Sequence, residues 1–302
     1  MRVCVFGAGS LGSALGALLA SRNEVFLIAR KAHVDAIRRK GLRLIGSRRR
    51  VTHLEARETV KGVPTPDLLI IATKAYDTGS AVDACRPMVS ESTRILTLQN
   101  GLGNLELLRA WKGRSAFGGT TTMGAVLESP GVVRISGMGH TVIGADLDQT
   151  GASWVASLFD ECGIPVRVSR DTNGEMWAKA VVNACINPIT SILRVPNGAL
   201  LESKGVTALM DGVCVECEKV ASAAGIALPK PVMRARVHAV ARDTSRNRSS
   251  MLRDVELGRR TEIMQINGKF SEFGRGTGVA TPLNNALVAM VEALAPACPE
   301  KG

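Results

Sequence analysis

The sequence has few aromatic side chains and no long hydrophobic run. Aromatic residues make up 3% of its 302 residues, and no signature of a nucleic-acid-binding module is present. It has no run of 18 or more apolar residues, so we expect no membrane-spanning helix. The first apolar stretch is interrupted by glycines at positions 7 and 9, so we expect no secretory signal. These absences argue against membrane and nucleic-acid partners.

Cysteines are scattered and odd in number. Seven cysteines without a regular spacing predict reduced thiols, as in a cytoplasmic protein. Cys214 and Cys217 form a C-x-x-C inside a predicted helix, without a second cysteine pair or a histidine cluster nearby. We interpret this pair as two core-facing helical residues, and the sequence predicts no metal site.

The charge balance is strongly basic in an otherwise ordinary composition. Hydrophobic residues make up 45% and charged residues 22%, which is typical of a soluble globular protein, and the net charge is +11. Such a surplus attracts anionic small molecules. Nucleic-acid binding is the competing interpretation, but the densest basic run, Arg48–Arg50, fits a solvated hairpin turn.

The first twelve residues carry a dinucleotide-binding fingerprint. An apolar strand over 3–6 precedes the glycine-rich turn, and a small-residue helix over 13–20 follows it. Such a turn bends at its first glycine, approaches a pyrophosphate at its second and packs helix against strand at its third. The cofactor-binding residues predicted here are Gly7, Ala8, Gly9, Ser10, Leu11 and Gly12.

The end of the next strand indicates which dinucleotide is bound. In this fold an acidic residue about 20 positions further on binds the ribose 2′-hydroxyl of NAD. Here the strand over 24–29 ends at Arg30, followed by Lys31, with no carboxylate. A guanidinium suits a 2′-phosphate because it donates two parallel hydrogen bonds. The pattern favours NADP(H), with a solvated basic strand end as the alternative.

Further strands and then a helical region complete the predicted architecture. Strands over 67–73 and 94–98 end at Lys74 and Asn100, where a parallel sheet presents side chains to a ligand. The fold class is α/β: a Rossmann-type nucleotide-binding domain over 1–170, then an all-helical domain over 171–302. One predicted strand pair joins 42–45 with 51–54, and another lies on either side of the turn at 129–131. Further strands are predicted at 140–144 and 165–168, with a helix over 154–162 between them. The helices expected in the second domain cover 173–186, 206–224, 231–241, 250–266 and 282–294. We expect the active site in the cleft between the domains.

One predicted helix of the second domain carries a polar stripe. Lys179, Asn183 and Asn187 are spaced by four and share a helix face, whereas the residues between them are apolar. Buried polar groups need partners, and a small oxygen-rich anion would satisfy one cation and two amides. Pairing with other helices in the core is the alternative. Because Asn187 precedes Pro188, its helical geometry is the less secure.

At this point the chain resembles the 2-dehydropantoate 2-reductases, also called ketopantoate reductases, over nearly its whole length. The motifs of the second domain are more specific than the glycine turn. The resemblance rests on GAGSLG at 7–12, TKAYD at 73–77, QNGLG at 99–103, GTTT at 119–122, WAKAVVNACINP at 177–188, PNG at 196–198, SSMLRD at 249–254 and TEIMQING at 261–268. Asp77 departs from the pattern, since related chains can carry a longer amide there.

The resemblance implies a role for particular residues. Lys179 would be the proton donor. Substrate contacts would come from Asn100, Asn183, Asn187, Asn197 and Ser250. Cofactor contacts would come from Lys74, Asn100, Ala125 and Glu262. Read from the sequence alone, Ser249 or Ser250 is a helix cap and Glu262 could equally be a surface residue.

The reaction implied is NADPH-dependent reduction of 2-dehydropantoate to pantoate, a step towards pantothenate and coenzyme A. Its partner would be a small 2-oxo acid, and a homodimer is compatible with the resemblance. Two alternatives stay open: a reductase of another branched or hydroxylated 2-oxo acid, and a non-catalytic NADP-binding sensor that would not need Lys179.

Overall fold

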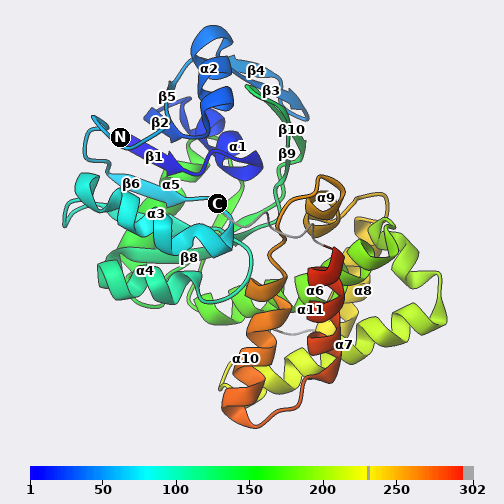
Figure 1. Cartoon of the computed structure of the whole chain (residues 1–302). Coiled ribbons are helices and arrows are strands. Elements are labelled where there is room, and N and C mark those ends of the chain that lie inside the picture. Colours follow the sequence, from blue (N-terminus) through cyan, green and yellow to red (C-terminus); the bar gives the residue numbers. More distant parts are fainter. Residues whose placement is uncertain (230–231, 295–302) are drawn as a thin grey trace, which may run out of the picture. The chain divides into compact units, whose positions relative to one another are not determined.

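Short apolar segments form the central strands of a mostly parallel sheet (Figure 1). Strands β5-β2-β1-β6-β7-β8 run parallel in the order of a dinucleotide-binding Rossmann sheet. The edge is extended by β11, antiparallel to β8, and by β12, parallel to β11. In spatial order the strands are β12 (Val166–Ser169), β11 (Thr141–Gly144), β8 (Ala116–Thr121), β7 (Arg94–Thr97), β6 (Leu68–Ile71), β1 (Arg2–Phe6), β2 (Glu24–Ile28) and β5 (Glu55–Arg57).

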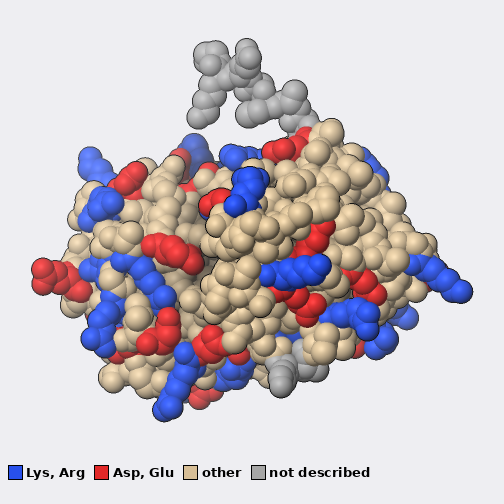
Figure 2. Space-filling view, turned by 90° about the horizontal axis from the view of Figure 1, so that it is seen from below, with Lys and Arg blue, Asp and Glu red and all other residues tan. Residues whose placement is uncertain are grey.

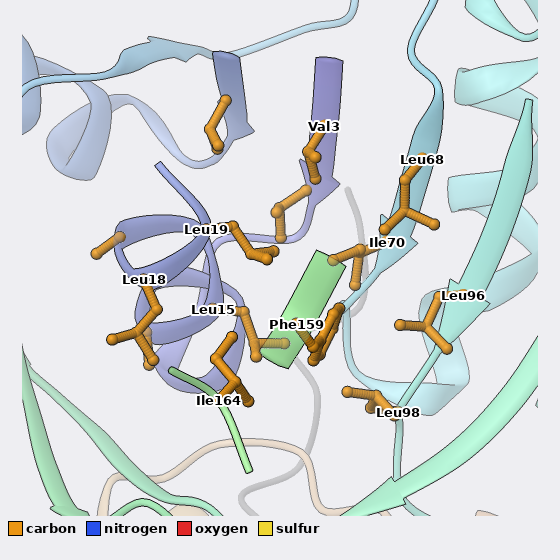
Figure 3. Packing of buried hydrophobic residues seen from close by; sticks show 14 of the residues in the cluster. Val3, Leu15, Leu18, Leu19, Leu68, Ile70, Leu96, Leu98, Phe159 and Ile164 are labelled. Carbon is orange, nitrogen blue, oxygen red and sulfur yellow. The ribbon is translucent and has the colours of Figure 1, made fainter. Parts of the chain in front are cut away.

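Helices cover both faces of this sheet because side chains alternate along its strands. Val3 and Val5 of β1 join the apolar layer formed with α1 (Ser10–Leu19) and α5 (Gln149–Asp160). Cys4 faces the opposite layer, which contains α3 and α4. Figure 3 shows side chains of α1, β6 and α5 in the first layer. The remaining helical segments of this region are α3 (Thr78–Cys85), α4 (Asn104–Lys112), η1 (Ala75–Asp77), η2 (Arg86–Met88) and η3 (Gly113–Ser115).

A second, four-stranded sheet lies in the same region in the order β4-β3-β10-β9. Both predicted hairpins are present in it, and the parallel pairing of β3 with β10 joins them. The basic run Arg48–Arg50 is exposed at the β3–β4 turn. Charges of both signs are interspersed on the face shown in Figure 2. The elements are α2 (Lys31–Lys40), β3 (Leu42–Gly46), β4 (Arg50–Thr52), β9 (Gly124–Ser129) and β10 (Val132–Gly137).

The rest of the chain is helical, as the sequence predicts. The computed structural model describes residues 1–229 and 232–294, and from position 173 onward these contain no strand. Cys214 and Cys217 are fully buried on α7, within the apolar core of these helices. The elements are α6 (Thr172–Leu193), η4 (Asn197–Leu201), α7 (Lys204–Ala223), α8 (Met233–Asp243), α9 (Ser250–Glu256), η5 (Ile263–Gln265), α10 (Asn267–Thr277) and α11 (Pro282–Leu294).

The largest differences from the predicted helices of the second domain concern α6, α9 and α10. The single helix expected over 250–266 is wrong, because Gly258 adopts a φ of +60° and ends α9. Helix α10 was not expected at all. Helix α6 continues seven residues beyond the predicted end at 186, through Pro188. The predicted start of α8 at 231 lies outside the described residues.

The chain divides into two compact units whose sequence ranges interleave. One unit contains Met1–Gln99 and Asn104–Thr172, and the other contains Asn100–Gly103 and the chain from Asn173 onward. A single division at residue 170 lies two residues before the last change of unit and leaves Asn100–Gly103 in the wrong part. The segment Asn100–Gly103 joins the helical unit, where the Leu102 amide donates to the Gln265 carbonyl at 3.0 Å.

Candidate active site

The glycine turn between β1 and α1 has the geometry expected of a phosphate-binding loop. Gly7 has a φ of +97°, and a Cβ there would lie 2.5 Å from the amide nitrogen of Thr73. A Cβ at Gly12 would lie 2.5 Å from the Gly7 carbonyl oxygen and 3.2 Å from the Cβ of Ala72. The first glycine thus permits the turn, and the third permits close packing of helix on strand.

Open space lies beside the second glycine. Gly9 is exposed, and no described atom lies within 4 Å of the position its Cβ would take. It precedes α1, whose N-terminus has no side-chain cap and no acidic residue in its first turn. The uncapped N–H groups and the helix dipole favour an anion at this end. A dinucleotide pyrophosphate fits this loop.

A buried hydrogen-bond chain supports the loop from behind, and sequence reasoning missed it. The Gly131 amide donates to Nδ1 of His33 at 2.9 Å, so the neutral ring carries its proton on Nε2. Nε2 lies 3.0 Å from Oγ of Ser13, which donates to the Ala8 carbonyl at 3.1 Å. Burial lowers the pKa of His33, which keeps the ring neutral. The sequence signal for a buried His33 is its place beside Val34 and Ile37, the apolar residues that α2 buries.

The predicted 2′-phosphate position lies where β2 ends and α2 begins. Arg30 is exposed, caps α2 and makes no side-chain hydrogen bond or ion pair with the described residues. The neighbouring Lys31 pairs with Asp35 at 3.3 Å and with Glu58 at 3.9 Å. The guanidinium of Arg30 is therefore free to bind an anion, whereas Lys31 is already partly neutralised.

A buried glutamine joins the carboxyl ends of β6 and β7. Nε2 of Gln99 donates to the Thr73 carbonyl at 2.9 Å and to Oγ1 of Thr78 at 3.0 Å, and Oε1 accepts from Oγ1 of Thr97 at 2.8 Å. These bonds hold the segment that carries Lys74, which is half-buried three residues after the end of β6. Gln99 is a second residue that sequence reasoning missed, although it lies within the QNGLG motif.

The other first-unit positions differ in their surroundings. Oγ of Ser10 accepts the Leu127 amide at 3.0 Å, which ties the start of α1 to β9. Ala125 lies on the same strand and is half-buried. Ala8 is buried, and Leu11 packs against the apolar layer of the sheet. Asp77, where the chain departs from the family pattern, is exposed.

The helical unit assembles the predicted substrate residues on α6. Because α6 continues through Pro188, Asn187 is helical, which corrects the expectation drawn from the proline. Lys179, Asn183 and Asn187 therefore lie one turn apart on one face. Lys179 and Asn183 are half-buried, and Asn187 is 7% exposed. None of the three side chains hydrogen-bonds to another described residue.

Lys179 has an environment suited to proton transfer. Burial lowers the pKa of Lys179 from 10.5 to about 8, while the negative charge of Glu262 acts in the opposite direction. Glu262 is itself buried, and its Oε2 accepts from Nδ2 of Asn100 at 3.3 Å. The helical unit thus places Asn100 beside the carboxylate that acts on Lys179.

The two remaining predicted substrate residues have different surroundings. Ser249 caps α9 by accepting the Leu252 amide at 3.1 Å, which leaves Ser250 exposed at the first helical position. Ser249 also lies 2.8 Å from the hydroxyl of Thr190 on α6. Asn197 is buried, and its Nδ2 donates to Oγ1 of Thr244 at 2.8 Å. Substrate contact by Asn197 and Ser250 stays a prediction.

The described residues contain no group of three or more His, Cys, Asp or Glu side chains that could bind a metal ion. Among residues 1–229 and 232–294, every helix is too short or too polar to cross a lipid bilayer.

Comparison with known proteins identifies the family of this chain. Residues 3–147 match the family described as ketopantoate reductase PanE/ApbA, and residues 171–295 match its C-terminal domain. A 2-dehydropantoate 2-reductase of Pyrococcus horikoshii is 38% identical over 298 residues, covering 97% of both chains. The chain belongs to the ketopantoate reductase family. Another member, from Archaeoglobus fulgidus, is 35% identical and covers 96% of both chains.

Solved structures share the fold of this family member. A ketopantoate reductase from Ralstonia eutropha is 33% identical, with a TM-score of 0.92 over 97% of this chain and 98% of that one. A D-mandelate dehydrogenase with bound NADH and anilino(oxo)acetate is 28% identical, with a TM-score of 0.91 over the same shares. Family membership and the Rossmann sheet together imply an oxidoreductase that uses a nicotinamide cofactor.

Proposed function

We propose that this protein reduces 2-dehydropantoate to pantoate with NADPH, and that Lys179 is the proton donor. The observation that carries the proposal is the α6 stripe: a lysine with a lowered pKa and two amides that have no partner among the described residues. Relatives named 2-dehydropantoate 2-reductase, at up to 38% identity, support the choice of substrate. The reaction would supply pantoate for pantothenate synthesis in the cytoplasm.

Lys179 acts where negative charge develops on the substrate. When bound, the reduced nicotinamide supplies a hydride to the C2 carbonyl carbon of the 2-oxo acid. The Lys179 ammonium stabilises the developing alkoxide and then donates its proton to that oxygen. Its lowered pKa makes it a stronger acid than an ordinary lysine. Glu262 opposes this lowering and so keeps the amine protonated at neutral pH.

The amides hold and orient the substrate. Asn183 and Asn187 hydrogen-bond the carboxylate and hydroxyl of the acid, with Ser250, Asn197 and Asn100 as further predicted contacts. Binding sites that hydrogen-bond a substrate hydroxyl reject analogues without it by as much as about 10⁴-fold. We therefore expect the 4-hydroxylated 2-dehydropantoate to be preferred over plain branched 2-oxo acids.

The glycine turn and the strand ends after β2, β6 and β7 would hold the cofactor. The exposed, unpaired Arg30 favours NADPH, because its guanidinium can bind a 2′-phosphate. Lys74 and Ala125 are the other predicted cofactor contacts in this unit, with Glu262 and Asn100 in the helical unit.

A second candidate function comes from the likeness to D-mandelate dehydrogenase, whose structure holds NADH and an oxo acid. It is the reduction of another 2-oxo acid. A panel of 2-oxo acids, each assayed with NADPH and NADH at the nicotinamide absorbance, distinguishes the two. We expect 2-dehydropantoate with NADPH to give the highest kcat/KM. A higher kcat/KM for another acid would replace the first proposal, and NADPH binding without turnover of any acid would indicate a sensor.

The role of Lys179 is tested by substitution. We expect Lys179→Ala to lower turnover at least about 10²-fold, the usual effect of losing a general acid. NADPH affinity should change little, because Lys179 is predicted to act on the substrate. Near-normal turnover of a folded variant would remove Lys179 from the mechanism.

A further inference from the structure

Helix α6 lacks one backbone hydrogen bond between its two substrate-facing amides. Pro188 has no N–H, so the Ala184 carbonyl cannot receive its usual helical donor four residues later. This gap lies within the turn that connects Asn183 to Asn187. Helix kinks sharper than about 20° occur mostly at proline and at a few other interruptions of the hydrogen-bond ladder. A kink here would change the separation of the two carboxamides.

A side chain from another helix takes the place of the missing donor. Nδ2 of Asn267, the first residue of α10, donates to the Ala184 carbonyl at 3.1 Å. Asn267 is completely buried, although it is 83 positions away in the sequence. The bond fixes the carbonyl that Pro188 leaves without a backbone partner.

The orientation of the Asn267 amide is set by a chain of hydrogen bonds that begins at a carboxylate. Oε2 of Glu216 accepts from the backbone amide of Asn284 at 3.0 Å and from its Nδ2 at 2.8 Å. An ionised carboxylate only accepts, so Oδ1 of Asn284 must face Asn267. Nδ2 of Asn267 donates to that oxygen at 3.0 Å. Both amide hydrogens of Asn267 are therefore committed.

The arrangement leaves one polar atom unsatisfied. Oδ1 of Asn267 is buried and has no hydrogen-bond partner in the described part of the chain. An unpaired buried acceptor is destabilising. The position therefore keeps a donor for the Ala184 carbonyl at the expense of an orphaned acceptor.

We propose that Asn267 is a positioning residue for the substrate: it replaces the hydrogen bond that Pro188 removes and so fixes Asn187 relative to Asn183 and Lys179. The inference rests on the proposed reduction of a 2-oxo acid by the α6 stripe. Asn267 itself acts through α6, without touching the substrate.

The test measures KM and kcat separately in the full-length protein, with 2-dehydropantoate and saturating NADPH. We expect Asn267→Ala to raise KM for the acid about tenfold and to change kcat less than about threefold, because the loss falls on substrate binding. The fall of kcat/KM at alkaline pH, which reports Lys179, should stay near pH 8.

Two further variants separate positioning from general stability. Pro188→Ala restores a backbone donor to the Ala184 carbonyl, so Asn267→Ala in that background should raise KM less than about twofold. Ser271→Ala is the matched control: Ser271 is a buried polar residue of α10 whose hydroxyl donates to the Asn267 carbonyl at 3.2 Å. We expect it to leave KM unchanged.

Each outcome decides the inference. An unchanged KM in Asn267→Ala, or an equal rise in the Pro188→Ala background, overturns it. If Asn267→Ala does not fold, recovery of soluble protein by Pro188→Ala in the double variant supports it, and no recovery overturns it. If the wild-type protein reduces no 2-oxo acid, the proposed function fails instead, which is a distinguishable result.

Discussion

The lowered pKa of Lys179 predicts a specific pH dependence of reduction. A general acid must be protonated to act, so kcat/KM should fall as pH rises through the pKa of about 8. With that pKa, roughly nine-tenths of the amine is protonated at pH 7 and about one-tenth at pH 9. The value of kcat/KM should therefore fall about tenfold between pH 7 and pH 9. A lysine with its ordinary pKa of 10.5 would lose almost nothing over the same range.

Substituting Glu262 tests how much its negative charge raises the pKa of Lys179. Two unit charges 4 Å apart interact by about 1 kcal/mol in water and about 4 kcal/mol at an effective dielectric of 20. Because Lys179 makes no ion pair with a described residue, these figures are upper bounds for its attraction to Glu262. Glu262→Gln keeps an acceptor for Asn100 and removes the charge. We expect the alkaline limb to move by about half to one pH unit towards lower pH.

The assay follows NADPH absorbance from pH 6 to pH 10 at low substrate, since kcat/KM reports groups of the free enzyme. Lys179→Arg is the control, because a guanidinium does not titrate in this range and the limb near pH 8 should disappear. A wild-type profile that stays flat to pH 10, or a limb that survives in Lys179→Arg, would refute the assignment.

Three further predictions follow from the nucleotide-binding unit. Arg30→Ala should weaken NADPH binding by at least about tenfold while changing NADH binding little, measured by fluorescence titration; equal losses would place Arg30 outside the cofactor site. Gly9→Ala should leave the melting temperature unchanged but abolish tight NADPH binding, because its methyl group enters the open space at the loop. Gly7→Ala should instead lower the free energy of unfolding by several kcal/mol, because its Cβ meets Thr73. In the folded protein the pKa of His33 lies below its unfolded value of about 6.5, so below that pH the unfolded chain binds more protons. The free energy of unfolding therefore falls as pH drops, by at most about 1.4 kcal/mol per pH unit. Urea unfolding at pH 7 and pH 5 should show a smaller difference in His33→Gln, and an undiminished difference would contradict this origin.

The parts of the fold that sequence reasoning predicts are those encoded by neighbouring residues. The glycine turn is recognisable because strand, turn and helix are contiguous. It predicts a Rossmann-type domain, and the observed order β5-β2-β1-β6-β7-β8 is that of such a sheet. The stripe of Lys179, Asn183 and Asn187 needs only helical periodicity. The local rule for residues before proline gave the wrong expectation for Asn187, because tertiary hydrogen bonding stabilises α6 through Pro188.

The supporting residues could not be predicted because their partners are remote in sequence. His33 meets Gly131 across 98 positions, and Asn267 meets Ala184 across 83. Gln99 bonds to three threonines on neighbouring segments of the sheet edge. Each is a polar residue of ordinary type, and even where periodicity indicates a buried face, as for His33 beside Val34 and Ile37, the partner is not encoded nearby. Periodicity predicts on which face of a helix or strand a side chain lies, but it does not predict the hydrogen-bond partner of that side chain.

The interleaved ranges of the two units affect how the protein can be divided experimentally. The chain passes from one unit to the other at three points, after Gln99, Gly103 and Thr172. A fragment that starts at Asn173 would keep Lys179 and Glu262 but lose the amide that donates to Glu262, since that donor is encoded 162 positions earlier. Expressed separately, the C-terminal half would lack four residues of its own unit, and the N-terminal half would carry these four without their partners. A shuffling experiment that exchanges the helical half between homologues must therefore carry the tetrapeptide Asn100–Gly103 along with it.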